Sequence, residues 1–257
     1  MKISVEFRAR VLARQWLAGT FINLGSSVTA EIAGNAGYDW LLIDHEHGPG
    51  GEDTLLHQLQ AAAATPAVPI VRIAANEPPR FKRALDMGAH GVMVPYVNNE
   101  AEAKAAAMAF RYPPRGFRGV AKFNRGAGFS QDFEEYYLHA HERLVLVAQV
   151  ETVESVASVD AIAAVDGIDV LFVGPSDLSY NMGIRDQLDH PRFVQALQAV
   201  VAAAQRSGKA AGILAHNPSL VEKWRDIGFT FMALGSDGGA VNAGLRQNLA
   251  TLRAAGK

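Results

Sequence analysis

Short apolar runs recur along the whole chain, separated by longer stretches in which apolar and polar residues mix. The runs are rich in Val, Leu and Ile and show no polar alternation, which is typical of parallel strands buried on both faces. This pattern predicts strands at 18–24, 40–44, 69–73, 90–95, 144–151, 168–177, 209–214 and 229–235.

The stretches between the runs have the length and composition of helices. Ser26 and Ser27 suit a helix start, and the Pro78-Pro79 pair suits the first turn of another helix. Glycines mark several helix ends. We expect helices at 5–15, 27–36, 52–64, 78–87, 101–110, 153–165, 191–207, 218–227 and 240–255.

Eight alternations of strand and helix in 257 residues predict one closed (β/α)8 TIM barrel that takes up residues 1–257 as a single domain. A doubly wound open sheet is the alternative, because periodicity does not reveal closure. No Pro/Gly/Ser linker divides the chain. The segment 111–129 is rich in Gly, Pro and Arg, and a loop of that length in a compact domain is usually functional.

Composition narrows the function classes. Hydrophobic residues make up 49% of the chain and charged residues 19%, which is ordinary globular usage. A formal net charge of −2 gives no excess of basic residues for binding nucleic acid. The absence of Cys excludes disulfides, thiolate catalysis and zinc–thiolate sites. With no signal-like N-terminus and no apolar stretch long enough for a bilayer, we expect a soluble, cytoplasmic protein without a membrane partner.

Two of the predicted strands end in a carboxylate. Glu151 follows the run that starts at 144, and Asp177 follows the run that starts at 168. The carboxyl ends of parallel strands lie at the ligand-binding edge of such a sheet. Two hard oxygen ligands from neighbouring strands form a half-site for a divalent cation that keeps several waters. The alternative is that each acid only caps the helix that follows it.

Other polar side chains are expected at the same edge. A metal and an arginine can both stabilise negative charge on a carbonyl oxygen while a neutral imidazole moves a proton. Asp44 is placed to orient His47; the alternatives are a surface position for His47 and a structural salt bridge for Arg72. The predicted rim comprises Asp44, His45, Glu46, His47, Arg72, Gln149, Glu151, Ser176 and Asp177.

The segment GPSDLS (174–179) places backbone N–H groups at a helix start, where a small carboxylate or a phosphate can bind. Ser176 is equally suited to be an ordinary N-cap. Schiff-base chemistry needs a lysine inside the barrel mouth. Lys209 is instead at the start of a strand, at the opposite end of the barrel, and Lys122, in the long loop, is the only possible exception, so this chemistry is disfavoured. No Gly-rich phosphate loop is present, so we expect no nucleotide cofactor.

Five segments, four at the predicted rim and one in the long loop, form a recognisable set: WLLIDHEH (40–47), VR (71–72), RYPPRGFRG (111–119), QVET (149–152) and GPSDLS (174–179). Together they resemble the HpcH/HpaI aldolase family of metal-dependent (class II) pyruvate aldolases, which act on 4-hydroxy-2-oxo acids such as 4-hydroxy-2-oxoheptanedioate and 2-keto-3-deoxy sugar acids. The resemblance extends from the second predicted strand to the sixth, and the alternation of strands and helices matches over nearly the whole chain.

The resemblance implies that Glu151 and Asp177 bind Mg²⁺, Mn²⁺ or Co²⁺, which pyruvate would chelate through its keto and carboxylate oxygens. It also implies that Arg72 contacts the keto oxygen and stabilises the enolate, and that His47, paired with Asp44, is the acid/base. The implied reaction is the reversible cleavage of a 4-hydroxy-2-oxo acid to pyruvate and an aldehyde, in aromatic or sugar-acid catabolism.

Further positions acquire roles by the same resemblance. Asp86 matches a family acid with a supporting catalytic role, and Gln149 would line the site near the metal. The backbone at Gly174, Ser176 and Asp177 would hold the pyruvate carboxylate. Family members are typically hexamers in which the last helix packs on a neighbouring barrel, so we expect a homo-oligomer.

The chain departs from the family pattern at His45, where Gly is frequent, at Ser176, where Ala is frequent, and at 121–125. His45 is expected to influence the choice of aldehyde. Two other functions remain open: an acyl-CoA lyase of the citrate-lyase type, and a non-catalytic barrel that senses a small oxo acid. The lyase would need a basic surface for the CoA phosphates, for which the candidates are Arg111, Arg115, Arg118 and Lys122.

Overall fold

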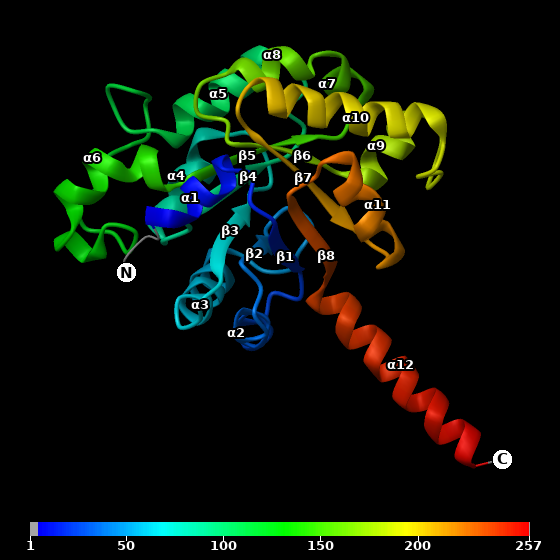
Figure 1. The fold of residues 1–257 in the computed structure, drawn as a ribbon. Helices are drawn as coiled ribbons and strands as arrows, with labels where there is room; N and C mark the ends of the chain where they lie inside the picture. The colour runs from blue at the N-terminus through cyan, green and yellow to red at the C-terminus, as the bar shows by residue number, and fades with distance from the viewer. Residues whose placement is uncertain (1–4, 257) are drawn as a thin grey trace.

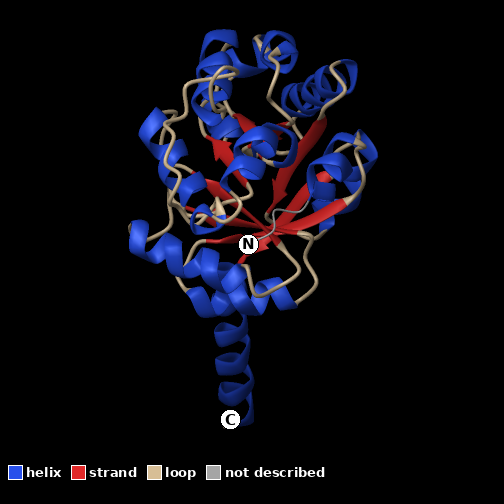
Figure 2. Ribbon diagram, turned by 90° about the vertical axis from the view of Figure 1, so that its left-hand side faces the viewer, coloured by secondary structure: helices blue, strands red, loops and turns tan. Residues whose placement is uncertain are grey.

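The computed structural model, which describes residues 5–256, is a barrel of parallel strands surrounded by helices (Figures 1 and 2). The strands pair in chain order, and β1 also pairs with β8, with Leu17 opposite Phe231. This pairing closes the sheet, confirms the predicted TIM barrel and excludes the open doubly wound sheet. The strands are β1 Leu17–Ile22, β2 Trp40–Asp44, β3 Val68–Arg72, β4 Gly91–Val94, β5 Val145–Val150, β6 Val170–Val173, β7 Ala210–Ala215 and β8 Phe231–Ser236.

Helices follow the strands and cover the outside of the barrel. Ser26 accepts the N–H of Thr29 at the start of α2, as its sequence position predicts. The helical elements are α1 Val5–Leu12, α2 Ser27–Asn35, α3 Glu52–Ala62, α4 Pro78–Asp86, α5 Glu100–Phe110, η1 Gly128–Ser130, α6 Phe133–Arg143, α7 Val153–Ala157, α8 Val159–Ala164, α9 Pro175–Asn181, α10 Pro191–Arg206, α11 Ser219–Ile227 and α12 Asp237–Ala255.

Large aromatic side chains fill the barrel interior. The rings of Trp40 and Phe231 stack with centroids 4.0 Å apart, and Phe172 meets Trp40 edge-on at 6.3 Å. Glycines make room for these rings: a Cβ on Gly19 would lie 2.1 Å from the Trp40 ring, and one on Gly212 would lie 2.5 Å from Phe172. The interior of the barrel is therefore a packed core rather than a pore.

The end of the barrel at which the strands begin is closed by α1. Arg8 donates from both Nε and Nη2 to Asp169 Oδ1, at 3.0 and 2.7 Å, and Asp169 Oδ2 accepts the N–H of Leu146 at 3.0 Å. Burial raises the pKa of Asp169, and Arg8 opposes that shift. The Asp169 carboxylate is almost inaccessible to solvent. Its two hydrogen bonds with Arg8 therefore fix α1 over the end of the barrel opposite the predicted site.

The structure differs from the predicted elements in three places. The predicted strand 168–177 ends at Val173, and Pro175–Asn181 form helix α9. Helix α6 follows the irregular segment 111–129 and was not predicted. The predicted helix 153–165 is two short helices, α7 and α8, because Ser158 has non-helical backbone angles (φ −100°, ψ 7°) and ends one helix as the next begins. The other predicted elements are present, with ends that differ by a few residues.

Arg118 orders the segment 111–129. Its side chain is fully buried, donates to the Tyr136 hydroxyl at 3.0 Å and to Asp86 at 2.7 Å, and lies 4.3 Å from the centre of the Tyr112 ring. These contacts join the segment to α6 and to the last residue of α4. Arg118 thus anchors the segment to the barrel, while residues 119–123 are exposed.

Helix α12 projects away from the barrel in both views (Figures 1 and 2). Only its first residues contact β1, β8 and α2, and every residue from Gly239 to Gly256 is exposed. An apolar stripe runs along it, formed by Val241, Leu245, Leu249 and Leu252. Within residues 5–256, no helix combines the length and hydropathy needed to cross a bilayer.

Candidate active site

A cavity of about 570 Å³ opens at the carboxyl ends of the strands. Residues at or just beyond the carboxyl ends of seven of the eight strands line it. Ligands bind at this end of the barrel in TIM-barrel enzymes. Most of the predicted rim residues line it. The lining comprises Phe21, Asn23, Asp44, His47, Arg72, Gln149, Phe172, Gly174, Pro175, Ser176, Asp177, Leu214, His216, Gly235, Ser236 and Gly239.

Arg72, the last residue of β3, is held in a fixed orientation by two acids. Its Nε and Nη2 donate to the two oxygens of Asp44 at 2.9 and 2.7 Å, and its Nη1 lies 2.9 Å from Glu46 Oε2. Asp44 ends β2, directly opposite Arg72 in the parallel register. Burial alone would raise the pKa of Asp44, but the hydrogen bonds and charge of Arg72 outweigh it and lower that pKa. Asp44 is therefore an anion that orients the guanidinium.

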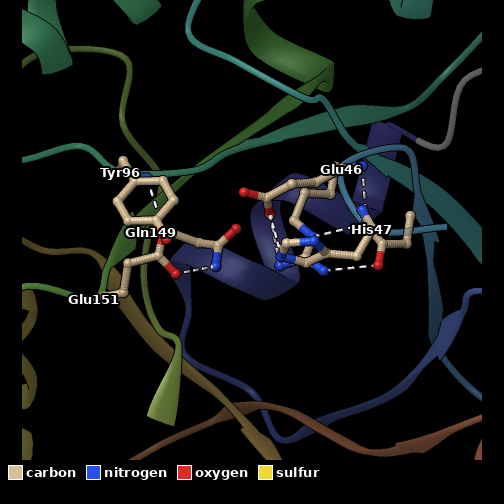
Figure 3. A network of polar contacts seen from close by, with 7 residues as sticks. Glu46, His47, Tyr96, Gln149 and Glu151 are labelled. Atoms are coloured by element: carbon tan, nitrogen blue, oxygen red, sulfur yellow. Dashed lines mark hydrogen bonds and ion pairs between the residues drawn. The ribbon is translucent and has the colours of Figure 1, made fainter. Parts of the chain in front are cut away.

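The predicted pairing of Asp44 with the His47 imidazole is wrong. Both Asp44 oxygens are occupied by Arg72, and His47 reaches Asp44 only through its backbone N–H, at 3.3 Å. The His47 side chain lines the cavity, is 66% exposed, and has Nε2 3.8 Å from Glu46 Oε2 (Figure 3). The acid beside this imidazole is therefore Glu46, which also contacts Arg72.

Glu151 lies at the exit of β5 and is almost completely buried. Its Oε1 accepts the N–H of Tyr96 at 2.8 Å and its Oε2 accepts Nε2 of Gln149 at 2.7 Å, contacts that Figure 3 shows together. Burial, followed by repulsion from Asp177 and Glu46, raises the pKa of Glu151 to about 7. A nearby cation would stabilise the ionised form of this carboxyl, because its charge would compensate for the hydration lost on burial.

The surroundings of Glu151 and Asp177 fit a divalent cation. Strands β5 and β6 are neighbours; Glu151 directly follows β5, Asp177 lies in the first turn of the helix after β6, and its charge acts on Glu151. The Gln149 Oε1 atom beside them is buried without a hydrogen-bond partner, and a Cβ on Gly174 would lie 2.5 Å from Glu151 Oε2. Within residues 5–256, no three His, Asp or Glu side chains cluster as metal ligands. Two carboxylates with the remaining positions left to water and substrate are typical of Mg²⁺ sites.

The first turn of α9 forms another part of the cavity wall. Gly174 is the N-cap, so Ser176 is not, and the N–H groups of a first helical turn have no intrahelical acceptor. The Ser176 hydroxyl is instead 3.3 Å from Nε2 of His216. Ser176 thus presents both a backbone N–H and a side chain to the cavity.

Asp86 and His45 do not reach the cavity of their own chain. Asp86 ends α4, on the side of the barrel where strands begin, and accepts a hydrogen bond from Arg118. From that position Asp86 cannot act at the cavity of its own chain. Its carboxylate instead holds Arg118 and, through it, the segment 111–129. His45 Nε2 lies 3.4 Å from Oε1 of Gln58 in α3, and an influence of His45 on the choice of aldehyde stays a prediction.

Sequence reasoning missed several cavity residues. His216 and Asn23 follow β7 and β1 by one residue each, so the rule that found Arg72 could have found them. Phe21 also lies beside the guanidinium, with its ring centre 5.3 Å from Arg72 Cζ. Tyr96 has a left-handed backbone (φ 51°) that directs its N–H to Glu151, and no sequence signal identifies such a conformation.

Comparisons with known proteins identify the family. Residues 17–243 match the model of the HpcH/HpaI aldolase/citrate lyase family. The 4-hydroxy-2-oxo-heptane-1,7-dioate aldolase of Escherichia coli is 38% identical over 232 residues, which are 90% of this chain and 88% of that protein.

Solved structures agree with this match. An HpcH/HpaI aldolase/citrate lyase family protein from Burkholderia cenocepacia J2315 superimposes with a TM-score of 0.92 at 35% identity, covering 97% of this chain and 100% of that one. The citrate synthase SbnG superimposes with a TM-score of 0.86 at 29% identity, covering 98% and 99%. The chain therefore belongs to the HpcH/HpaI aldolase/citrate lyase family.

Proposed function

We propose that this protein is a divalent-metal-dependent aldolase that reversibly cleaves a 4-hydroxy-2-oxo acid to pyruvate and an aldehyde. The observation that carries the proposal is a locked guanidinium, Arg72, and a carboxylate, Asp177, in the lining of one cavity, with the buried carboxylate Glu151 directly behind the lining residue Gln149. The activity named for the Escherichia coli relative, which aligns over nearly the whole chain, supports the same reaction class.

In this proposal Glu151 and Asp177 would hold Mg²⁺, Mn²⁺ or Co²⁺. The ion, when bound, supplies positive charge that polarises the keto group of the substrate. Gln149 holds Glu151 by donating from Nε2, while its unpartnered Oε1 is free to accept a hydrogen bond at the same place. The free backbone N–H groups of Ser176 and Asp177 suit the substrate carboxylate.

Arg72 is the group that stabilises the negative charge that cleavage creates on the keto oxygen. Of its five N–H groups, two donate to Asp44 and one faces Glu46, which leaves two for the substrate. A donor whose orientation is already fixed needs no reorganisation when the charge develops. Asp44 and Glu46 are accordingly positioning residues.

His47 is the proposed acid/base. It is a cavity residue whose imidazole is accessible to both substrate and solvent. In cleavage it takes the proton of the 4-hydroxyl group; the C3–C4 bond breaks, and its electron pair moves onto the three-carbon fragment to give the enolate of pyruvate. Protonation at C3 then completes pyruvate, and the reverse sequence is aldol addition.

The acyl-CoA alternative finds no support in the positions of its basic residues. Arg118 is fully buried and Arg111 is paired with Asp166 at 2.6 Å. None of the four candidate residues lines the cavity. Within residues 5–256, these four residues therefore form no basic surface in the cavity lining that could receive CoA phosphates.

Exchange of the pyruvate methyl protons in D₂O tests the proposed function without requiring the aldehyde to be known. We expect the methyl signal to disappear with protein loaded with Mg²⁺, Mn²⁺ or Co²⁺ and to persist with metal-stripped protein, measured by NMR after an EDTA quench. Exchange shows that the chain forms the enolate. If no metal produces exchange, the pyruvate assignment is wrong, and turnover of malyl-CoA or citramalyl-CoA becomes the next measurement.

We also propose that α12 packs on a second copy of this chain, in a homo-oligomer; the family resemblance predicts a hexamer. A helix with an exposed apolar stripe gains most of its stability from tertiary packing, which α12 lacks in the single chain. Two exposed apolar residues of α2, Val28 and Ile32, provide a further surface beside the start of α12.

Replacing both Leu245 and Leu249 with glutamate is expected to reduce the assembly, because charges on the stripe cannot be buried. Light scattering should report a multiple of 27.5 kDa for the wild type and a smaller mass for the variant. Gln247→Glu with Thr251→Glu is the matched control, since these positions lie off the stripe. A wild-type mass of a single chain would contradict the proposal.

A further inference from the structure

The cavity mouth has two halves with different chemistry. The groups assigned to pyruvate and the metal follow β2, β3, β5 and β6. The other half follows β7, β8 and β1, which are consecutive around the barrel, and Ser176 lies at the border between the two halves. The second half has no role in the steps described above, so it is free to contact the rest of the substrate.

His216 is the largest polar group in this second half. It follows β7 directly, lines the cavity and is exposed at its mouth. Its Nε2 is 3.3 Å from the Ser176 hydroxyl, and no described residue is recorded as a partner of its Nδ1. Desolvation lowers the pKa of His216, and the charge of Asp186 offsets this only in part. At neutral pH the imidazole is therefore uncharged, with one donor and one acceptor nitrogen.

Asn23 is the second such group. Its backbone N–H donates to Asp237 at 2.8 Å, which fixes the residue at the exit of β1. Its side-chain amide lines the cavity and has no hydrogen-bond partner among the described residues. The Ser236 hydroxyl accepts the N–H of Gly239 at the start of α12, which uses one of its two acceptor positions within the chain.

The charge of the cavity limits what these groups can bind. Arg72 is the only Arg or Lys among the lining residues, and its charge is balanced by Asp44 and Glu46. Asp177 adds a further acid. A ligand with a second carboxylate would find no free cation here, whereas hydroxyl groups can both donate to and accept from His216, Ser176 and Asn23.

We propose that His216 and Ser176, together with Asn23, form a subsite for hydroxyl groups on the aldehyde portion of the substrate. The preferred aldehyde is then short, uncharged and hydroxylated, unlike the second carboxylate end of the dioate named for the Escherichia coli relative. This inference rests on the proposed aldolase function and assigns His216 as a specificity-determining residue.

The test compares addition of pyruvate to glyceraldehyde, propanal and succinic semialdehyde by the metal-loaded protein. We expect kcat/KM for glyceraldehyde to exceed the values for the other two aldehydes. In His216→Leu the glyceraldehyde value should fall by about tenfold to a hundredfold while the propanal value stays within about twofold, because a polar contact is lost only for the hydroxylated substrate. His216→Asn, which keeps a donor and an acceptor, should recover part of the loss.

Pyruvate methyl exchange, measured on the same samples, separates the two proposals. Exchange should be equal in the wild type, His216→Leu and the control His57→Leu, whose histidine is exposed on α3. Absence of exchange in the wild type would refute the aldolase function itself. Normal exchange with an unaltered aldehyde preference in His216→Leu, a wild-type preference for succinic semialdehyde, or loss of exchange in His216→Leu would each overturn the subsite.

Discussion

Replacing Glu151 with glutamine is expected to weaken divalent-metal binding by more than about a hundredfold and to abolish cleavage and pyruvate exchange together. The substitution removes one of two carboxylates while keeping the size of the side chain and its acceptor for the Tyr96 N–H. Asp177→Asn should have the same effect. Titration with Mn²⁺ by calorimetry, together with activity after EDTA treatment and metal readdition, measures both losses.

The matched control is Glu154→Gln, three residues further along the chain and exposed on α7. It should bind metal and turn over as the wild type does. Full activity of the Glu151→Gln, Asp177→Asn double variant after EDTA treatment would remove both acids from the proposed metal site.

The pH dependence of metal binding provides a further check on Glu151. Its pKa of about 7 in the metal-free chain means that a proton competes with the metal at neutral pH. Above pH 7 the carboxylate is ionised and affinity is at its plateau, whereas below pH 7 the apparent affinity should fall about tenfold per unit for the one proton displaced. The Glu151→Gln variant should lose this component of the pH profile.

Arg72→Ala is expected to lower kcat for cleavage by at least about a hundredfold, since it removes the donor assigned to the developing oxyanion. Arg72→Lys should rescue little, because an ammonium cannot replace the planar fork that joins Asp44 and Glu46. The measurement is single-turnover cleavage with metal bound. Near-normal turnover in Arg72→Ala would exclude the residue from the mechanism.

The same substitution also affects stability, so folding must be measured in parallel. Without the guanidinium, Asp44 is left buried and unpaired, which costs about 3–5 kcal/mol for a broken buried ion pair. Urea unfolding of Arg72→Ala should therefore show a lower midpoint than the wild type. If the variant is still folded at the assay temperature, its loss of turnover reports chemistry alone.

The strand ends were the most predictable part of the site. Arg72, Glu151 and Asp177 were identified because each follows an apolar run, and parallel strands bring such positions to one edge. Closure of the barrel was a weaker prediction, because it depends on the pairing of β1 with β8 across the whole chain. Local patterns contain no information on that pairing.

Side-chain partners were the least predictable part. Asp44 and His47 are close in sequence, but Asp44 pairs with Arg72 because the parallel register of β2 and β3 places the two residues opposite each other. Asp86 has a site role only by the family resemblance, and its contact with Arg118, across 32 positions, is likewise one that no local pattern identifies. Both corrections arise from contacts between distant segments.

Helix α12 has a thermodynamic consequence for the whole chain. In the homo-oligomer proposed above, residues 239–256, which are exposed in the single chain, would be ordered by the free energy of association. For such a chain folding and assembly are linked by mass action, and the unfolding midpoint rises with protein concentration. Dilution alone should then loosen the terminal helix before the barrel itself unfolds.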